Sequence, residues 1–147
     1  MPEARRKAHL LCQHYNALPE DDTAGREAIL DALMPDHGKG VYLQGPIQFD
    51  FDSHIHIGDG SYANFHFCVL DENQVTIGDN CWIGGNVTIL PGVTIGSGCV
   101  IGAGSVVTRS IPAGSLAFGN PCRVVRPITD ADRMSRHPER LADEAAQ

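Results

Sequence analysis

The chain has 147 residues, which suits one compact domain, and its formal net charge is -7. This acidic balance excludes a typical nucleic-acid-binding surface, which must be basic to contact phosphates. No apolar run approaches the ~18 residues of a membrane-spanning helix. The five cysteines show no metal-ligand spacing and no leader sequence is recognisable, so reduced thiols in the cytoplasm are expected.

The first forty residues differ in composition from the rest, because fifteen of the sixteen glycines lie at or after Gly38. Apolar residues at helical spacing predict a helix from about Glu3 and a second one that ends before Pro35, separated by a polar loop. The apolar side of the first helix is expected to hold Leu10, Leu11 and Tyr15. That of the second is expected to hold Ile29, Leu30, Leu33 and Met34.

Alternating polar and apolar residues after Val41 predict a strand whose polar side carries the carboxylates Asp50 and Asp52. A first, less regular turn of a coil is expected to follow through Ile57, Ala63 and Val69. The next residues, 71–74, break the alternation. We therefore expect a protruding corner there, suited to form the wall of a site.

A six-residue repeat from Val75 to Thr108 determines the expected fold. Two apolar positions in each hexad are separated by one residue, as in a strand, and glycine or asparagine at the hexad ends suits tight corners. Three strands and three corners close one turn of a parallel β-helix with a triangular cross-section. An ordinary sandwich of short strands is the alternative. The repeated aliphatic position is occupied by Ile77, Ile83, Ile89, Ile95, Ile101 and Val107.

A turn and an edge strand are expected from Gly119 to Arg126. Thr129 either caps a short helix or begins a frayed tail. The predicted organisation is thus a helical segment at 1–40, a β-helix at 41–128 and a C-terminal tail at 129–147.

The chain contains several further motifs that matter together because of their order. They are Pro2-Glu3-Ala4-Arg5, Tyr15-Asn16, Ile55-His56-Ile57-Gly58, Tyr62-Ala63-Asn64-Phe65, residues 75–80, Trp82-Ile83-Gly84-Gly85, and residues 101–108 and 119–126. In this order they resemble the maltose and galactoside O-acetyltransferases of the hexapeptide-repeat superfamily. The resemblance implies a homotrimer of left-handed parallel β-helices that transfers an acetyl group from acetyl-CoA to a sugar hydroxyl, with active sites between subunits. It implies no metal.

The resemblance also implies that a catalytic piece is missing. After the first Thr-Ile-Gly-Asp-Asn hexad, the family has a protruding loop with a His-Pro pair whose histidine is the general base, whereas here Asn80 continues directly into Cys81. About one turn of coil is absent, so acetyl transfer is expected to be impaired. The alternative is a non-catalytic trimer that retains coenzyme A binding or a structural role. Only His66, where the family has asparagine, is a candidate replacement, or else a solvent-facing corner residue.

Binding residues follow from the same resemblance, and each could instead be an ordinary structural or solvent-facing residue. An acidic sugar ligand that the family carries ahead of Arg5 has no counterpart, which implies a weaker acceptor site. The sugar-binding residues implied are Arg5, Asp50, Tyr62, Asn64 and Asp71. The coenzyme A contacts implied are Trp82, Gly85, Ala103, Thr108, Arg109, Arg123 and Arg126.

Overall fold

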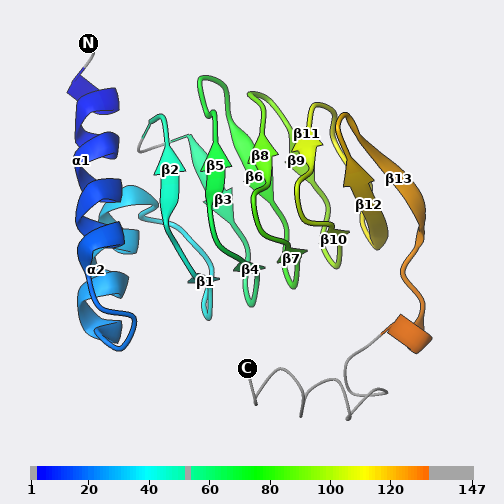
Figure 1. Ribbon diagram of the computed structural model, residues 1–147, viewed down its shortest axis with the longest axis horizontal. Coiled ribbons are helices and arrows are strands. Elements are labelled where there is room, and N and C mark those ends of the chain that lie inside the picture. The colour runs from blue at the N-terminus through cyan, green and yellow to red at the C-terminus, as the bar shows by residue number, and fades with distance from the viewer. Residues whose placement is uncertain (1–2, 52–53, 133–147) are drawn as a thin grey trace.

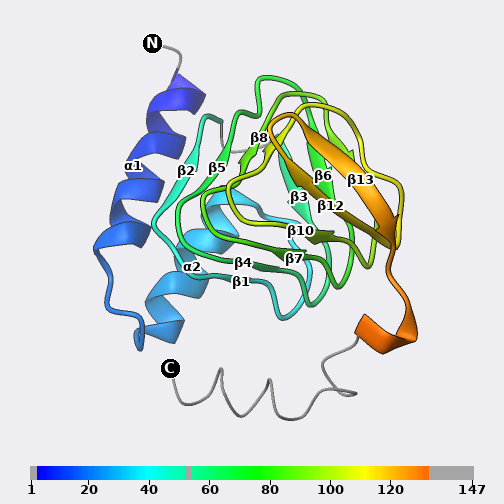
Figure 2. The ribbon, with the colours of Figure 1, turned by 45° about the vertical axis from the view of Figure 1, so that its right-hand side comes forward.

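The computed structural model describes residues 3–51 and 54–132 (Figure 1). Two helices, α1 (Glu3–Ala17) and α2 (Thr23–Leu33), lie against the first turn of a β-solenoid of about 4 turns. Figure 2 shows the turns one behind another, with the helices at one end. The expected outward carboxylate Asp52 and the expected tail beyond residue 132 lie outside the described residues.

The strands form three sheets, and successive strands of a turn belong to different sheets. The 6-stranded sheet contains, in order, β1 (Tyr42–Leu43), β4 (Tyr62–Ala63), β7 (Trp82–Ile83), β10 (Val100–Ile101), β12 (Ser115–Gly119) and β13 (Cys122–Pro127). The 4-stranded sheet contains β11 (Val106–Val107), β8 (Thr88–Ile89), β5 (Phe67–Val69) and β2 (Ile47–Phe49). The 3-stranded sheet contains β3 (Ile55–Ile57), β6 (Val75–Ile77) and β9 (Thr94–Ile95).

Parallel pairing between turns confirms the triangular coil and excludes the sandwich. Ile83 pairs with Ala63 on one side and with Ile101 on the other, so equivalent hexad positions stack. Every member of the aliphatic column from Ile77 to Val107 is at most 1% exposed. Asn80 and Asn86 adopt positive φ angles of 53° and 57° at two of the corners, as residues at hexad ends were expected to do.

The helical cap is fixed to the first turn by side chains that bond the backbone of β1. The Tyr15 hydroxyl donates to the Leu43 carbonyl at 2.6 Å, and Arg26 Nη2 donates to the same oxygen at 2.8 Å. The apolar stripe of α1 is Ala8, Cys12 and Tyr15, spaced four and three residues apart. The expectation for Leu10 was therefore wrong: it lies off this stripe and is 45% exposed.

The coil starts within the predicted range 41–128, but its first turn lies earlier than the expected one through Ile57, Ala63 and Val69. Strands β1, β2 and β3 already complete a turn, so Ile57 ends the first turn instead of starting it. The first turn lacks the regular hexad glycines, which is why the repeat does not show it. At the other end, β13 pairs antiparallel with β12. A single 3-10 turn, Asp130–Asp132, follows Thr129.

Candidate functional site

The corners of the coil stack into edges because equivalent strands are neighbours in one sheet. The loops after β2, β5, β8 and β11 form what we call the first edge, visible along the top of the coil in Figure 1. The loops after β1, β4, β7 and β10 form the second edge. In residues, the first edge comprises 50, 51, 54, 70–74, 90–93 and 108–110, and the second comprises 44–46, 64–66, 84–87 and 102–105.

The expected site residues divide between these two edges, so one chain does not bring all of them together. The first edge, with the adjacent face of α1, holds Arg5, Asp50, Asp71, Thr108 and Arg109. The second edge and the 6-stranded sheet that leads into it hold Tyr62, Asn64, His66, Trp82, Gly85, Ala103, Arg123 and Arg126.

Charged side chains cluster at the start of the first edge. Arg5 Nε lies 3.3 Å from Asp50 Oδ1, and His9 Nε2 lies 3.2 Å from the same oxygen. The Arg5 guanidinium also covers the Phe51 ring at 4.7 Å and approaches the Glu72 carboxylate at 3.9 Å. A mostly buried carboxylate held by a guanidinium and an imidazole is a suitable anchor for hydroxyl groups of a polar ligand.

Asp71 does not lie on the surface, where a residue that contacts the sugar was expected. Its side chain is fully buried, and Oδ1 accepts the backbone N–H groups of Asp50 at 3.0 Å and Phe51 at 2.8 Å. Burial raises the pKa of this carboxyl. Asp71 therefore shapes the corner from inside, while the neighbouring carboxylate of Glu72 is the one exposed beside Arg5.

Two histidines in this cluster were not expected there. His9 lies four residues after Arg5 on α1, so the helical repeat alone could have placed it on the same face. His54 Nδ1 lies 2.7 Å from the Asp71 carbonyl oxygen, and its ring stacks on Phe51 with centroids 5.1 Å apart. No local pattern predicts the His54 contact, because it joins residues from successive turns.

The 6-stranded sheet carries an aromatic ladder on its outer face beside the second edge. Tyr62 stacks on Tyr42 at 5.8 Å and lies 4.7 Å from Trp82, which is 40% exposed. Asn64 Oδ1 accepts the Phe65 N–H at 2.8 Å, which fixes the turn that follows β4. A Cβ on Gly84 would lie 2.7 Å from the Ala103 nitrogen, so this corner requires glycine for successive turns to pack.

His66 is exposed at a corner in left-handed backbone conformation, with φ at 59°. Within residues 3–51 and 54–132, no acidic or carbonyl group orients its ring by a hydrogen bond. The reading of His66 as a solvent-facing corner residue agrees with this placement better than a catalytic role does. A second chain could still approach it, because its side of the coil is open to solvent.

The expected coenzyme A residues are accessible. Ala103, Thr108, Arg109, Arg123 and Arg126 are all exposed. Arg126 already makes two 2.8 Å hydrogen bonds to the Asp132 carboxylate, and this pairing holds the pKa of Asp132 well below its usual range. Any phosphate that binds Arg126 must therefore compete with Asp132.

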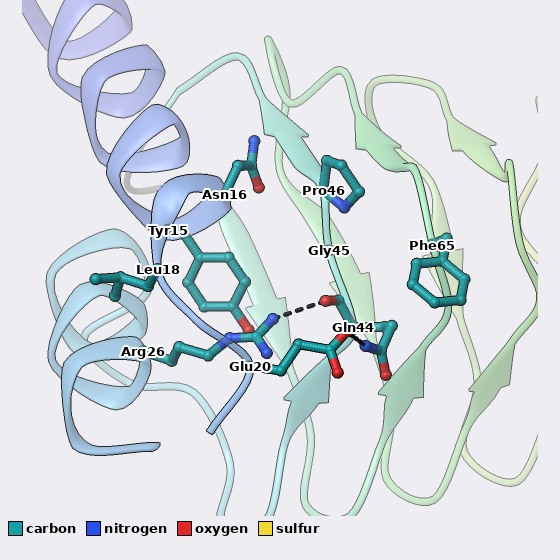
Figure 3. A pocket seen from close by; sticks show the side chains of 9 residues that line it. All are labelled: Tyr15, Asn16, Leu18, Glu20, Arg26, Gln44, Gly45, Pro46 and Phe65. Carbon is teal, nitrogen blue, oxygen red and sulfur yellow. Dashed lines mark hydrogen bonds between the residues drawn. The ribbon is translucent and has the colours of Figure 1, made fainter. Parts of the chain in front are cut away.

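The cavity in Figure 3 is separate from the first edge and has a volume of ≈ 170 Å³. It lies between the helical cap and the coil, lined by Tyr15, Asn16, Arg26 and others. Asn16 exchanges two hydrogen bonds with the backbone of Ile47, at 2.9 and 2.7 Å. The polar side chains that line this cavity thus serve mainly to attach the helical cap to the coil.

In the described part of the chain, no three acidic, histidine or cysteine side chains form a metal-binding group, and no helix could span a bilayer.

Comparisons with known proteins agree with this architecture. Residues 74–109 match the family model for the bacterial transferase hexapeptide (six repeats), and residues 2–38 match the maltose acetyltransferase hexapeptide capping motif. Galactoside O-acetyltransferase of Escherichia coli (strain K12) is 34% identical, covering 90% of this chain and 83% of that protein. The chain belongs to the maltose and galactoside O-acetyltransferase family.

Solved structures of this family have the same fold. A galactoside acetyltransferase in complex with coenzyme A matches with a TM-score of 0.72 and 34% identity, covering 89% of this chain and 84% of that one. A maltose O-acetyltransferase from Clostridium difficile 630 matches at 0.69 with 33% identity, covering 86% and 87%. The alignment with the Escherichia coli member of the family extends over 169 positions, more than the 147 residues of this chain. It therefore includes positions of that relative that this chain lacks.

Proposed function

We propose that this chain is an acetyl-CoA-dependent O-acetyltransferase that acts on a sugar hydroxyl, with a rate reduced by the absence of the His-Pro loop. Family membership supports the reaction class, since the relatives are named for acetyl transfer to galactosides and maltose. The solved relative that contains coenzyme A supports the donor. Five free cysteines suit a reducing compartment such as the cytoplasm.

The division of the expected site between two edges is the observation that carries this proposal. In a symmetric trimer, the first edge of one subunit can face the second edge of its neighbour, which would complete three identical sites. The acceptor sugar would then contact Arg5 and Asp50 of one subunit and Tyr62 and Asn64 of the next. Asp71 would support this pocket from beneath. Coenzyme A would contact Trp82, Gly85, Ala103, Thr108, Arg109, Arg123 and Arg126.

The donor and acceptor groups suit their ligands chemically. Arginines at positions 109, 123 and 126 offer positive charge and multiple N–H donors to phosphates. Backbone groups at glycine corners can approach the peptide-like pantetheine arm closely. The acceptor pocket combines carboxylate, amide and phenol groups, which together match the mixed donors and acceptors of a sugar.

A non-catalytic trimer that binds coenzyme A is the second candidate. The absence of the loop favours it, because a sugar hydroxyl is barely ionised at neutral pH and a positioned base contributes typically 10² to 10⁴ in rate. The isolated position of His66 also favours it. The two candidates agree on coenzyme A binding and differ only in sugar-dependent turnover.

Two measurements on the purified chain separate these candidates. Calorimetry with coenzyme A tests the donor site, and release of free thiol from acetyl-CoA with a panel of galactosides, maltose and glucose tests the reaction. We expect saturable binding and slow thiol release that depends on the sugar concentration. Binding without sugar-dependent release would support the non-catalytic trimer. Absence of binding would contradict both candidates.

A further inference from the structure

We propose that His54 supplies the general base for acetyl transfer in this chain, in place of the loop that it lacks. The inference rests on the proposed function, and it identifies a residue that neither the repeat nor the family motifs single out. His54 lies on the first edge, between β2 and β3, beside the cluster formed by Arg5 and Asp50.

The tautomer of His54 follows from its hydrogen bond. Nδ1 lies 2.7 Å from the Asp71 carbonyl oxygen, and a carbonyl oxygen can only accept, so Nδ1 carries the proton. In the neutral ring, the lone pair is then on Nε2. Within the described chain, Nε2 has no hydrogen-bond partner. A histidine held at its inner nitrogen by backbone, with its outer nitrogen unprotonated, is arranged as a proton acceptor.

The ring is also held in orientation from the side. Phe51 stacks on it with ring centroids 5.1 Å apart, and the Arg5 guanidinium lies 4.7 Å from the centroid of the same phenyl ring. The neighbouring carbonyl of Asp71 is fixed because the Asp71 side chain accepts two backbone N–H groups. Such support limits ring rotation, which is the condition for effective proton transfer.

The surroundings provide a place for a hydroxyl group. His54 is partly exposed, as are Arg5 and Asp50. The titratable and charged groups around this corner come from three elements: Arg5 and His9 on α1, Asp50 after β2, and Asp71 with Glu72 after β5. A sugar anchored on Asp50 would present its hydroxyl groups along the same edge as His54.

The first edge also leads toward the donor. The loops that contain His54, Asp71 and Thr108 follow β2, β5 and β11 of one continuous sheet. Backbone hydrogen bonds connect the start of each loop to the end of the strand in the next turn, from Asp50 N to Val69 O at 3.3 Å and from Leu70 N to Ile89 O at 2.9 Å. Thr108 and Arg109 therefore lie farther along the edge on which His54 is placed.

The proposed step balances in atoms and charge. Nε2 of His54 takes the proton of the sugar hydroxyl as its oxygen attacks the acetyl carbonyl carbon of acetyl-CoA. The C–O bond forms, and the C–S bond then breaks. The imidazolium returns the proton to the leaving thiolate, which gives the acetyl ester, coenzyme A and neutral His54.

His9 is the competing histidine on this edge. Its outer nitrogen, Nε2, is occupied by Asp50 Oδ1 at 3.2 Å, so only Nδ1, close to the helix backbone, could accept a proton. His9 thus positions Asp50, whereas His54 presents its outer nitrogen. Substitution of His54 should therefore remove the base, whereas substitution of His9 should disturb the position of Asp50.

The test compares His54→Asn with the wild-type chain. An asparagine amide can keep the donor to the Asp71 carbonyl, since it matches the position of Nδ1, but it has no base in place of Nε2. We expect a 10² to 10⁴-fold loss of sugar-dependent kcat/KM with coenzyme A affinity unchanged by calorimetry. The matched control is His14→Gln, at an exposed position of α1, which should keep wild-type turnover.

The pH profile provides a second readout that a structural role would not change. Wild-type kcat/KM should rise with pH as the base loses its proton, and the residual rate of His54→Asn should lack this rise. Turnover of His54→Asn within threefold of the wild type would overturn the inference and leave the proposed function intact. Wild-type chain that binds coenzyme A without any sugar-dependent thiol release would overturn it as well. Loss of coenzyme A binding in the wild type would contradict the proposed function itself.

Discussion

The Oδ1 atom of Asp71 accepts a hydrogen bond from the backbone N–H of Phe51 at 2.8 Å, across two successive turns of the coil. The same oxygen accepts the N–H of Asp50 at 3.0 Å. One buried carboxylate thus satisfies two backbone donors where β2 ends and the chain leaves regular pairing. The shape of the proposed acceptor corner depends on this bond.

Removal of the Asp71 carboxylate should destabilise the fold. In Asp71→Ala, the Phe51 N–H loses its acceptor and the Asp50 N–H keeps only its 3.3 Å bond to the Val69 carbonyl. An unsatisfied group costs about 1–3 kcal/mol, so we expect a loss of about 2 kcal/mol in the free energy of unfolding, measured in urea at fixed protomer concentration. Glu72→Ala, the exposed neighbour, is the control and should change it by less than about 0.5 kcal/mol. Equal effects of the two substitutions would contradict the anchoring role.

The contribution of Asp71 to the stability of the wild-type chain should depend on pH in the opposite sense to that of a carboxylate whose pKa is lowered by folding. Burial raises the pKa of Asp71, so the folded chain binds this proton more tightly than the unfolded chain. The resulting stabilisation is complete below the unfolded pKa of about 3.9 and is lost as pH rises through the folded pKa. Asp71→Asn keeps the acceptor oxygen without the titration. Its unfolding free energy relative to wild type should therefore increase from pH 4 to pH 7, and a decrease would refute the assignment.

Cys81 and Cys99 are predicted to remain reduced although they are neighbours on adjacent turns. The residues after them, Trp82 and Val100, pair directly, and both thiols are buried. Each thiol donates to a backbone carbonyl, to Gly96 at 3.2 Å and Pro112 at 3.1 Å. Mass measurement without reductant should show five free thiols, with Cys68 alkylated first because it is only partly buried. A bond between Cys81 and Cys99 would be the contrary result.

The coil could be predicted from sequence because its repeat is local. Each hexad by itself predicts one strand and one corner. Three hexads of equal length make one turn, so equivalent hexad positions stack in successive turns. The cap was only partly predictable, since Leu10 is as apolar as a core residue and only packing shows that Ala8 and Cys12 face inward.

The site depends on contacts between turns, which the repeat does not encode. Asp71 and Glu72 are adjacent carboxylates, and the sequence cannot show which one turns inward. His54 meets the Asp71 carbonyl only because β2 and β5 are neighbours in the sheet. The residues before β6 carry the corner that the broken alternation predicted, but the role of each side chain there required the structure.

Subunit mixing should reveal sites shared between chains. Asp50→Ala damages the first edge and Asn64→Ala the second, so each variant alone should lose most sugar-dependent turnover. In a trimer assembled from equal amounts of both, about a quarter of the sites would combine two intact edges and recover activity. Light scattering should give three times the 15.8 kDa chain mass. A monomer mass would contradict the shared site. So would the absence of recovered activity after the two variants are refolded together, when the wild-type chain refolded in the same way is active.

The pairing of Arg126 with Asp132 predicts that Asp132 lowers the affinity of the chain for coenzyme A. Arg126 makes two hydrogen bonds of 2.8 Å to Asp132, and these occupy N–H groups that a phosphate would use. Arg126→Ala should therefore weaken coenzyme A binding about tenfold or more, because a charge-assisted contact is lost. Asp132→Asn should strengthen it about threefold, a small effect because the ion pair is exposed. Asp21→Asn, an exposed carboxylate in the loop between α1 and α2, is the control for net charge. Calorimetry at low and high salt measures all three variants, and weaker binding by Asp132→Asn would show that Asp132 positions Arg126 for the ligand instead of competing with it.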